Sequence, residues 1–452
     1  MYPLTYYSFA TAQTLSIFKQ LLRFERLPLG IQHQEQRKQI SRLLMHAWQH
    51  SHFWRDRLSG SGFNPNNHHN FEISEIPILT RANLQSNFEQ LRARSPELIN
   101  TEIATVSTSG STGEPVRVEK SIFFQGPLEN ALALIDLRWH KRDPAKSIAF
   151  IGFGAKDKSL TSWGGIYHEL GWNGPYKIRA IENRNTQEHL DWLIKTQPDY
   201  LKASPFLVEE LAKLAMDNAM RLKINQVISM SERVSPVQRR LAFEVFGAKI
   251  IDRYSCEETG MMALQCPLHD HLHVLSAGSH LEIVNEFGRQ CRIGEIGTVL
   301  VTNLYSYAMP IIRYDLGDLA EWGSPCDCGI TLPVIKRLWG RKRHKAVGAG
   351  GYTFPMGFLG DELGKITNIK SFRIKQYLDN VVELEVVLAK TLSHEEKKVI
   401  SDIFTRNGFS GVDLFMCVVD QIVWPSNRKR EEFERIYSAY KPGNQGIVMR
   451  LE

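Results

Sequence analysis

The sequence predicts an α/β fold: a large N-terminal domain of mixed sheets and helices, followed by a small α+β C-terminal domain. Short apolar runs of strand composition, such as 147–153 and 248–254, alternate with helical patterns through residues 120–250. After Gly340 the sequence becomes basic and glycine-rich, which places a domain boundary near residue 340. With 452 residues, 43% of them hydrophobic, the chain can bury one large core and a second, smaller one.

Three further patterns support the N-terminal part of this fold. Apolar residues at helical spacing predict one amphipathic helix over residues 34–58. Ser204 can cap a helix whose first position is Pro205, where a missing N–H costs nothing. The run TVLVTNL at 298–304 predicts a strand.

The C-terminal part has its own alternation of strands and helix. Residues 372–388 predict two strands around an Asp379-Asn380 turn. Ser393 and Glu396 form a capping-box pair, and Asn407-Gly408 supplies the stop of the helix that they begin. Another apolar strand is expected at 414–419.

The charge and the cysteine distribution restrict the class of protein. A formal net charge of +6 permits polyanionic ligands such as nucleotides without requiring nucleic acid, so we expect no nucleic-acid partner. No run of eighteen apolar residues and no signal peptide is visible, so we expect no membrane span and a cytoplasmic location. The six cysteines all follow residue 255, which favours reduced thiols, some of them on a metal, over disulfides.

The segment 107–115 has the composition of a phosphate-binding loop. It reads S-T-S-G-S-T-G-E-P and follows an apolar stretch. Glycines let backbone N–H groups approach one anion, and hydroxyls add further donors. An ordinary turn of the same composition is the alternative. The residues concerned are Thr108, Ser109, Gly110, Ser111, Thr112 and Gly113.

Together with four later motifs, this loop resembles the acyl-adenylate-forming superfamily, and three further segments resemble its phenylacetate-CoA ligase branch. The later motifs occur in the family's order: DRYSCEETG at 252–260, RYDLGDLAEW at 313–322, GRKRHKAVGAGGYTFP at 340–355 and NRKREEF at 427–433. The segments of the branch are LLMHAWQHSHFWRDRL, IPILTRANL and QPDYLKASPFLVEELA.

The resemblance implies an enzyme that activates a carboxylic acid with ATP and Mg²⁺. Residues 1–340 would form the adenylation domain, which binds ATP and the acid, and residues 341–452 a small mobile lid. An acyl-AMP would form with release of pyrophosphate, and the acyl group would pass to coenzyme A. An amine, a hydroxyl or a carrier-protein thiol remains an alternative acceptor. The oligomeric state would be a monomer or a homodimer.

The resemblance also assigns roles to residues of the nucleotide site. The loop 108–113 would hold the β- and γ-phosphates, and Glu258 would help to bind Mg²⁺, which prefers carboxylate oxygen. Asp318 would accept hydrogen bonds from both ribose hydroxyls. Tyr254 would pack on the adenine, with Ser231 and Glu232 lining the other side of the base.

Two basic residues complete the catalytic set that the resemblance implies. Arg341, at the domain junction, would reach the nucleotide, where a guanidinium suits a phosphate or ribose oxygen. Lys429 would bridge the acid carboxylate and the α-phosphate, neutralising charge as the phosphorus becomes pentavalent. An exposed basic cluster is the alternative for Lys429.

The sequence departs from the family's pattern at two places. Glu257 occupies the position where the family usually has Thr or Ser. The junction carries Arg343 and His344 where the family has acidic residues. These departures indicate a domain rotation that differs from the family's, so thioester formation is less firmly predicted than adenylation.

A group of cysteines and histidines predicts a structural Zn²⁺ site. The residues after position 265 read C-P-L-H-D-H-L-H, and a C-x-C pair follows at 326–328. Thiolates and imidazoles are the usual ligands of a closed tetrahedral site. Ordinary reduced cysteines and surface histidines are the alternative. By resemblance to the branch the expected ligands are Cys266, His273, Cys326 and Cys328.

Two further expectations concern the substrate and a rival class of protein. Trp163, Tyr167 and Trp172 fall in the region that should line the acyl pocket, although core packing explains them equally well. A non-catalytic nucleotide- or nucleic-acid-binding protein is the rival, because basic and aromatic residues interleave between Lys336 and Lys345.

Overall fold

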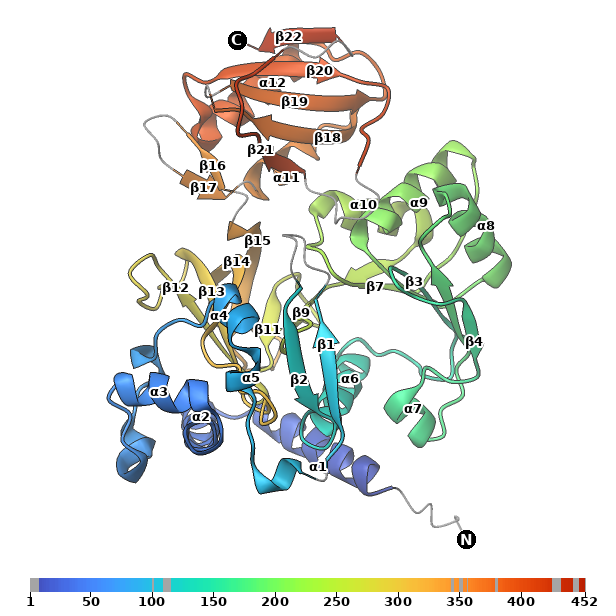
Figure 1. Cartoon of the computed structure of the whole chain (residues 1–452). Coiled ribbons are helices and arrows are strands. Elements are labelled where there is room, and N and C mark those ends of the chain that lie inside the picture. The colour runs from blue at the N-terminus through green and yellow to red at the C-terminus, as the bar shows by residue number, and fades with distance from the viewer. Residues whose placement is uncertain are drawn as a thin grey trace. The chain divides into compact units, whose positions relative to one another are not determined.

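The computed structural model describes residues 8–99, 101–108, 115–342, 345–348, 353–355, 357–378, 381–424, 432–441 and 447–451. The chain divides into two compact units (Figure 1). The first comprises 1–231, 242–316 and 320–338, and the second comprises 232–241, 317–319 and 339–452. Within the described ranges, no helix has both the length and the apolar character needed to cross a bilayer. The domain boundary at residue 340 stays a prediction.

The N-terminal helices of the first unit correct one expectation. The expected single helix over 34–58 is two helices, α2 (Leu29–His50) and α3 (His52–Gly60). Ser51 separates them, because its extended backbone ends α2 while its hydroxyl accepts a hydrogen bond from Trp54 N and caps α3. The other elements of this region are α1 (Phe9–Phe24), α4 (Arg81–Ser86), α5 (Phe88–Leu91) and the short 3₁₀ helices Pro65–Asn70, Ile73–Glu75 and Pro96–Leu98.

A six-stranded sheet forms the α/β part of the first unit. Its order is β4-β5-β3-β6-β7-β8, and the strands from β5 to β8 run parallel to one another. Ser204 caps the helix that begins at Pro205, as predicted. Helices α8 and α9 pack side by side next to the sheet (Figure 1). The elements are β3 (Ile148–Gly152), β4 (Lys158–Leu160), α7 (Gly165–Glu169), β5 (Tyr176–Ala180), α8 (Thr186–Thr196), β6 (Tyr200–Ala203), α9 (Pro205–Asp217), β7 (Gln226–Ser229), α10 (Pro236–Phe246) and β8 (Lys249–Ile251).

A seven-stranded sheet and a hairpin make up the rest of the first unit, except that residues 317–319 and 339–341 of this sheet belong to the second unit. The sheet order is β12-β13-β14-β15-β11-β10-β9. Apolar residues of this sheet, of α2 and of α3 share one buried cluster, which includes the fully buried Trp54. The elements are β1 (Ile103–Ser107), β2 (Arg117–Ser121), α6 (Gln125–Trp139), β9 (Arg253–Cys256), β10 (Gly260–Gln265), β11 (Leu272–Val274), β12 (Ser279–Val284), β13 (Ile296–Asn303), β14 (Tyr314–Trp322) and β15 (Val334–Arg341).

The second unit is a five-stranded sheet with helices on one face. The order is β21-β18-β19-β20-β22, and β18 and β19 are the antiparallel pair expected around 379–380. The predicted capping box of Ser393 and Glu396 begins α12. Apolar residues of α11 and α12 pack on the sheet and form a separate core. The elements are β16 (Lys345–Val347), β17 (Thr353–Pro355), α11 (Gly357–Leu363), β18 (Ile369–Gln376), β19 (Val381–Leu388), α12 (His394–Phe404), a π-helical turn (Thr405–Phe409), β20 (Asp413–Val418), β21 (Phe433–Arg435) and β22 (Ile447–Leu451).

Candidate nucleotide site and cysteine-histidine cluster

The predicted phosphate loop connects the antiparallel strands β1 and β2. Two hydrogen bonds between Thr108 and Val116 hold the two ends of the loop together. Thr108 N donates to Val116 O at 2.9 Å, and Val116 N donates to Thr108 Oγ1 at 3.0 Å. Thr108 therefore closes the loop, and its hydroxyl is already engaged as an acceptor. Ser109, Gly110, Ser111, Thr112 and Gly113 lie outside the described residues.

The predicted Mg²⁺ ligand Glu258 lies in the turn between β9 and β10. Its side chain is buried, whereas the neighbouring Glu257 is exposed. Tyr314, on β14, donates its hydroxyl to Glu258 Oε1 at 3.1 Å. Burial, followed by the charge of Glu258, raises the pKa of Tyr314, so the phenol stays a donor at neutral pH. The extra negative charge at Glu257 therefore belongs to an exposed residue, whereas Glu258 is buried.

Tyr254 and Ser231 differ in how the fold holds them. Tyr254, on β9, is 8% exposed and belongs to the main core cluster of the first unit. Ser231 follows β7 with a φ of 70°, a left-handed conformation that is uncommon outside glycine and marks a constrained site. Glu232 follows it directly and is partly buried.

Asp318 and Arg341 contact each other within the second unit. Arg341 Nε lies 3.3 Å from Asp318 Oδ1, and the Asp318 side chain is 18% exposed against 47% for Arg341. Gly317, directly before Asp318, has a φ of +73°, a conformation that L side chains rarely adopt. The Asp318 carboxylate and the Arg341 guanidinium, which were assigned to the nucleotide site from two different motifs, thus form an ion pair.

In the described part of the basic stretch, residues 336–342, two of the cations are paired and the tryptophan is buried. Lys336 pairs with Glu321 at 2.7 Å, Arg341 contacts Asp318, and Trp339 is 5% exposed. A buried indole offers no face for stacking a base, which argues against single-strand binding. Lys429, Arg343 and His344 lie outside the described residues.

A buried ion network beside β9 is a feature that the sequence did not reveal. Asp136, on α6, is fully buried and accepts hydrogen bonds from Arg142, at 2.7 and 3.1 Å, and from Arg253. Although burial opposes ionisation, the two arginines lower the pKa of Asp136. Burial lowers the pKa of the adjacent His140 to about 3. Arg253 directly precedes Tyr254, so the network anchors the start of β9.

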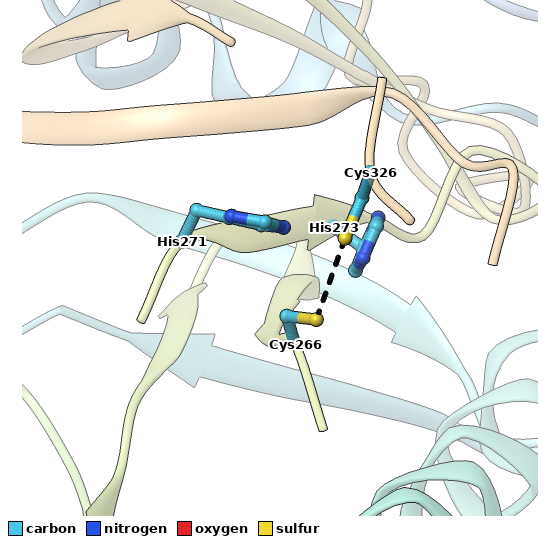
Figure 2. A group of neighbouring side chains, drawn as sticks. All are labelled: Cys266, His271, His273 and Cys326. Atoms are coloured by element: carbon cyan, nitrogen blue, oxygen red, sulfur yellow. Dashed lines mark hydrogen bonds between the residues drawn. The ribbon is translucent and has the colours of Figure 1, made fainter. Parts of the chain in front are cut away.

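Cysteines and histidines far apart in the sequence converge next to β10 and β11. The ligand atoms of Cys266, His271, His273 and Cys326 all lie within 4.8 Å of one another (Figure 2). The two sulfur atoms are 3.8 Å apart. Each accepts a backbone N–H from two residues further on, Leu268 N and Cys328 N, at 3.4 Å. Such donors stabilise a thiolate, which is the form that binds metal.

The two imidazoles are oriented differently. His273 is fully buried, and its Nδ1 contacts Leu332 O at 3.2 Å, which leaves Nε2 to face the sulfur atoms. Burial lowers the pKa of His273 to about 4, so its ring is neutral at pH 7. His271 Nε2 is buried without a hydrogen-bond partner among the described residues.

Cys328, expected as a ligand, lies beside the cluster but outside the compact set of four. Its Sγ lies 3.3 Å from His273 Nε2. The compact set therefore contains three expected residues, Cys266, His273 and Cys326, with His271 as the fourth member. His271 stands two positions before His273, so strand alternation was the signal that could have found it.

No protein-family model matches the chain, but curated proteins are similar to most of its length. Phenylacetate-coenzyme A ligase of Escherichia coli strain K12 is 22% identical over 387 residues, which cover 80% of this chain and 84% of that protein. The Pseudomonas putida protein of the same name is 23% identical over 399 residues, covering 82% and 86%. The chain is thus similar over most of its length to phenylacetate-CoA ligases of the acyl-adenylate-forming superfamily.

The solved structures agree with the superfamily fold. A 2-hydroxyisobutyryl-CoA ligase, crystallised in the postadenylation state with R3-HIB-AMP, superposes with a TM-score of 0.76 at 17% identity, covering 92% of this chain and 91% of that one. The predicted fold class of mixed sheets and helices is thereby confirmed, and the curated relatives agree with the resemblance that the motifs indicated. The role of each site residue stays a prediction.

Proposed function

We propose that this protein activates a carboxylic acid with ATP as an acyl-AMP, releases pyrophosphate, and then transfers the acyl group to coenzyme A. The observation that carries the proposal is the series of five motifs, in the family's order, along a chain with the family's fold. The relatives named above are phenylacetate-CoA ligases, and the structural neighbour is a 2-hydroxyisobutyryl-CoA ligase that holds an acyl-AMP. An aryl or small organic acid is the corresponding substrate.

In the first half-reaction the enzyme brings together two anions that repel each other, the acid carboxylate and the α-phosphate. The loop 108–113 holds the β- and γ-phosphates through backbone N–H groups and hydroxyls, and the two hydrogen bonds between Thr108 and Val116 keep its ends together. Lys429 binds the carboxylate and the α-phosphate at once, which neutralises charge where the new bond forms.

Glu258 fits the role of a magnesium ligand. It is a buried carboxylate, and a hydrogen bond from Tyr314 engages Oε1. When bound, Mg²⁺ would neutralise phosphate charge. Tyr314 orients the carboxylate, as outer-shell donors do in metal sites.

The acceptor is tested by presenting the adenylating enzyme with coenzyme A, with candidate amines and with a carrier-protein thiol. We expect a coenzyme A thioester for every acid that supports pyrophosphate exchange. The absence of a thioester for all such acids, together with an amide or ester product, would assign the chain to amide-forming or biosynthetic members instead. We also propose a cytoplasmic enzyme that is a monomer or homodimer, which light scattering and cell fractionation would test.

We further propose that the cysteine-histidine cluster holds a structural Zn²⁺. Two thiols that accept backbone N–H groups, and an imidazole fixed through its other nitrogen, match a closed tetrahedral site. His271 is the fourth ligand of this proposal, because its buried Nε2 lacks a partner among the described residues and a metal would satisfy it. The ion would tie the loop at Cys326 to β10 and β11.

A further inference from the structure

One face of the six-stranded sheet carries a group of aromatic side chains. Ile148, Tyr200 and Ile228, from β3, β6 and β7, form a buried cluster on this face, with Trp163 and Tyr176 packed against it. The Trp163 ring lies 5.5 Å from Tyr200 and 5.3 Å from Tyr167, measured between ring centroids. Side chains of these strands, together with Trp163, therefore form an apolar wall. An apolar wall of this kind suits a flat or hydrocarbon group.

Lys202 lies on the same face, within this apolar surrounding. It pairs in register with Phe150 across β3 and β6, and its Nζ is 5.1 Å from the centroid of the Phe150 ring. Phe150 in turn lies over Gly152, where an added Cβ would come within 2.4 Å of the ring. Glycine at 152 thus leaves the space that lets the Phe150 ring lie beside Lys202.

The ammonium of Lys202 has no carboxylate counter-ion within ion-pair distance among the described residues. Of the two carboxylates whose charges act on Lys202, Asp136 is neutralised by two arginines and Glu257 is exposed. Burial, with a further contribution from Arg253, lowers the pKa of Lys202 to about 8. Partial burial of a cation raises the free energy of the folded protein unless an anion or hydrogen-bond acceptor lies nearby. One aromatic ring offsets this free-energy cost only in part.

The location of Lys202 is one where ligands bind in this type of sheet. It stands next to the last residue of β6, and ligands of parallel α/β sheets bind outside the carboxyl ends of the strands. Glu257 and Arg253 are close enough to influence the Lys202 charge, and they belong to the strand and turn that carry Tyr254 and Glu258. The cation is therefore near the region assigned to the nucleotide.

We propose that Lys202 is a specificity-determining residue that selects a carboxylic acid bearing a second anionic oxygen group, a carboxylate or an ionised phenol, remote from the carboxylate that is activated. This inference rests on the proposed adenylating function. The aromatic wall binds the carbon skeleton, and Lys202 pairs with the distal anion. The acid supplies the counter-ion that the described residues do not, so a neutral analogue would leave the ammonium uncompensated.

The test measures acid-dependent ATP–pyrophosphate exchange with matched sets of acids. Each set contains a monocarboxylic acid, the same skeleton with a distal carboxylate, its hydroxyl analogue, and the distal carboxamide as a neutral isostere: benzoate, isophthalate, 3-hydroxybenzoate and isophthalamate, with a phenylacetate and a butyrate series beside it. For wild type we expect kcat/KM to favour the distal anion over the carboxamide by about tenfold or more.

Three variants separate the role of the charge from that of the fold. Lys202→Met should abolish the preference while keeping exchange with the monocarboxylic acid, and Lys202→Arg should retain the preference. Lys177→Met is the matched control, because Lys177 pairs in register with Ala149 and so lies on the opposite face of the same sheet. It should leave the preference unchanged. Thermal unfolding checks that the Met variant folds.

A preference that survives in Lys202→Met, or a wild type that favours the carboxamide, would overturn the inference and leave the adenylating function intact. A wild type that exchanges with no acid would instead overturn the adenylating function. Calorimetric binding of the same acids without ATP still decides the inference in that case: weaker binding of the dianion by Lys202→Met supports it, and equal binding overturns it.

Discussion

Tyr314 donates its hydroxyl hydrogen bond to Oε1 of Glu258, across 3.1 Å, and both side chains are buried. The two residues belong to different motifs of the family, one on β14 and one in the turn after β9. The hydrogen bond therefore connects two motifs that lie apart in the sequence, and it fixes the orientation of the carboxylate that we assign to Mg²⁺.

The Glu258 carboxylate and its donor should be separable by kinetics. We expect Glu258→Gln to lower pyrophosphate exchange by about 100-fold, because the metal loses an anionic ligand. Tyr314→Phe keeps the ring volume and removes only the donor, so it should raise the Mg²⁺ concentration for half-maximal activity about tenfold. Equal Mg²⁺ dependence in wild type and Tyr314→Phe would contradict the orienting role.

Asp318 should report on the ribose of ATP. If its carboxylate accepts from the ribose hydroxyls, wild type prefers ATP over 2′-deoxy-ATP, and Asp318→Asn should raise the KM for ATP about tenfold. The variant should also lose its discrimination between the two nucleotides, which steady-state exchange kinetics measures. Asp315→Asn, on the same strand, is the control and should keep the discrimination. An Asp318→Asn enzyme that still discriminates would place the ribose elsewhere.

Zinc binding should require the cysteines of the cluster and should not require a cysteine outside it. We expect one Zn²⁺ per chain by mass spectrometry of metals, lost in Cys266→Ser and Cys326→Ser and retained in Cys291→Ala, whose cysteine lies outside the cluster. Removal of zinc should lower the melting temperature, because a closed site stabilises the fold.

The fourth zinc ligand is decided by a pair of variants. His271→Gln should weaken zinc binding, whereas Cys328→Ser should retain it, in a competition with a coloured chelator. The reverse result would return Cys328 to the ligand set. A protein that binds no zinc under reducing conditions would remove the metal site altogether.

The stability of the fold should fall in mild acid because of His140. Its folded pKa of about 3 lies below the ordinary 6.5, so the unfolded chain takes up a proton that the folded chain refuses. The contribution of His140 to the free energy of unfolding is fully present above pH 6.5 and is lost as the pH falls toward 3. Buried His189 and His280 have lowered pKa values and act in the same direction.

Replacement of His140 isolates its share of this acid sensitivity. His140→Gln removes one titrating group, so the fall in unfolding free energy between pH 6 and 4 should become shallower by about 1.4 kcal/mol per pH unit. Urea denaturation at several pH values measures it. The exposed His52→Gln is the control. An unchanged slope in His140→Gln would show that this imidazole is protonated in the folded chain.

Local signals in the sequence predicted the elements that depend on neighbouring residues. The cap at Ser204 and the box of Ser393 and Glu396 occur as expected, because each involves residues within one helical turn. The break at Ser51 was missed, since the apolar spacing continues through it. The same hydroxyl that caps α3 was the available signal.

Features made by distant residues could not be read in this way. Asp136 and Arg253 are 117 positions apart, and no sequence pattern around either residue predicts its contact with the other. Lys202 is one lysine after an apolar pair, and only the register of β3 and β6 reveals Phe150 beside it. The motif series predicted a magnesium-binding role for Glu258, but it did not predict Tyr314 as the hydrogen-bond donor to it.

Acid-dependent ATP–pyrophosphate exchange tests the central proposal most directly. Across a panel of aryl, alkyl and amino acids, we expect wild type to exchange labelled pyrophosphate into ATP only when an accepted acid is present. The double variant Lys429→Ala with Glu258→Ala should lose that exchange. No exchange with any acid of the panel, or exchange that survives in the double variant, would contradict the assignment.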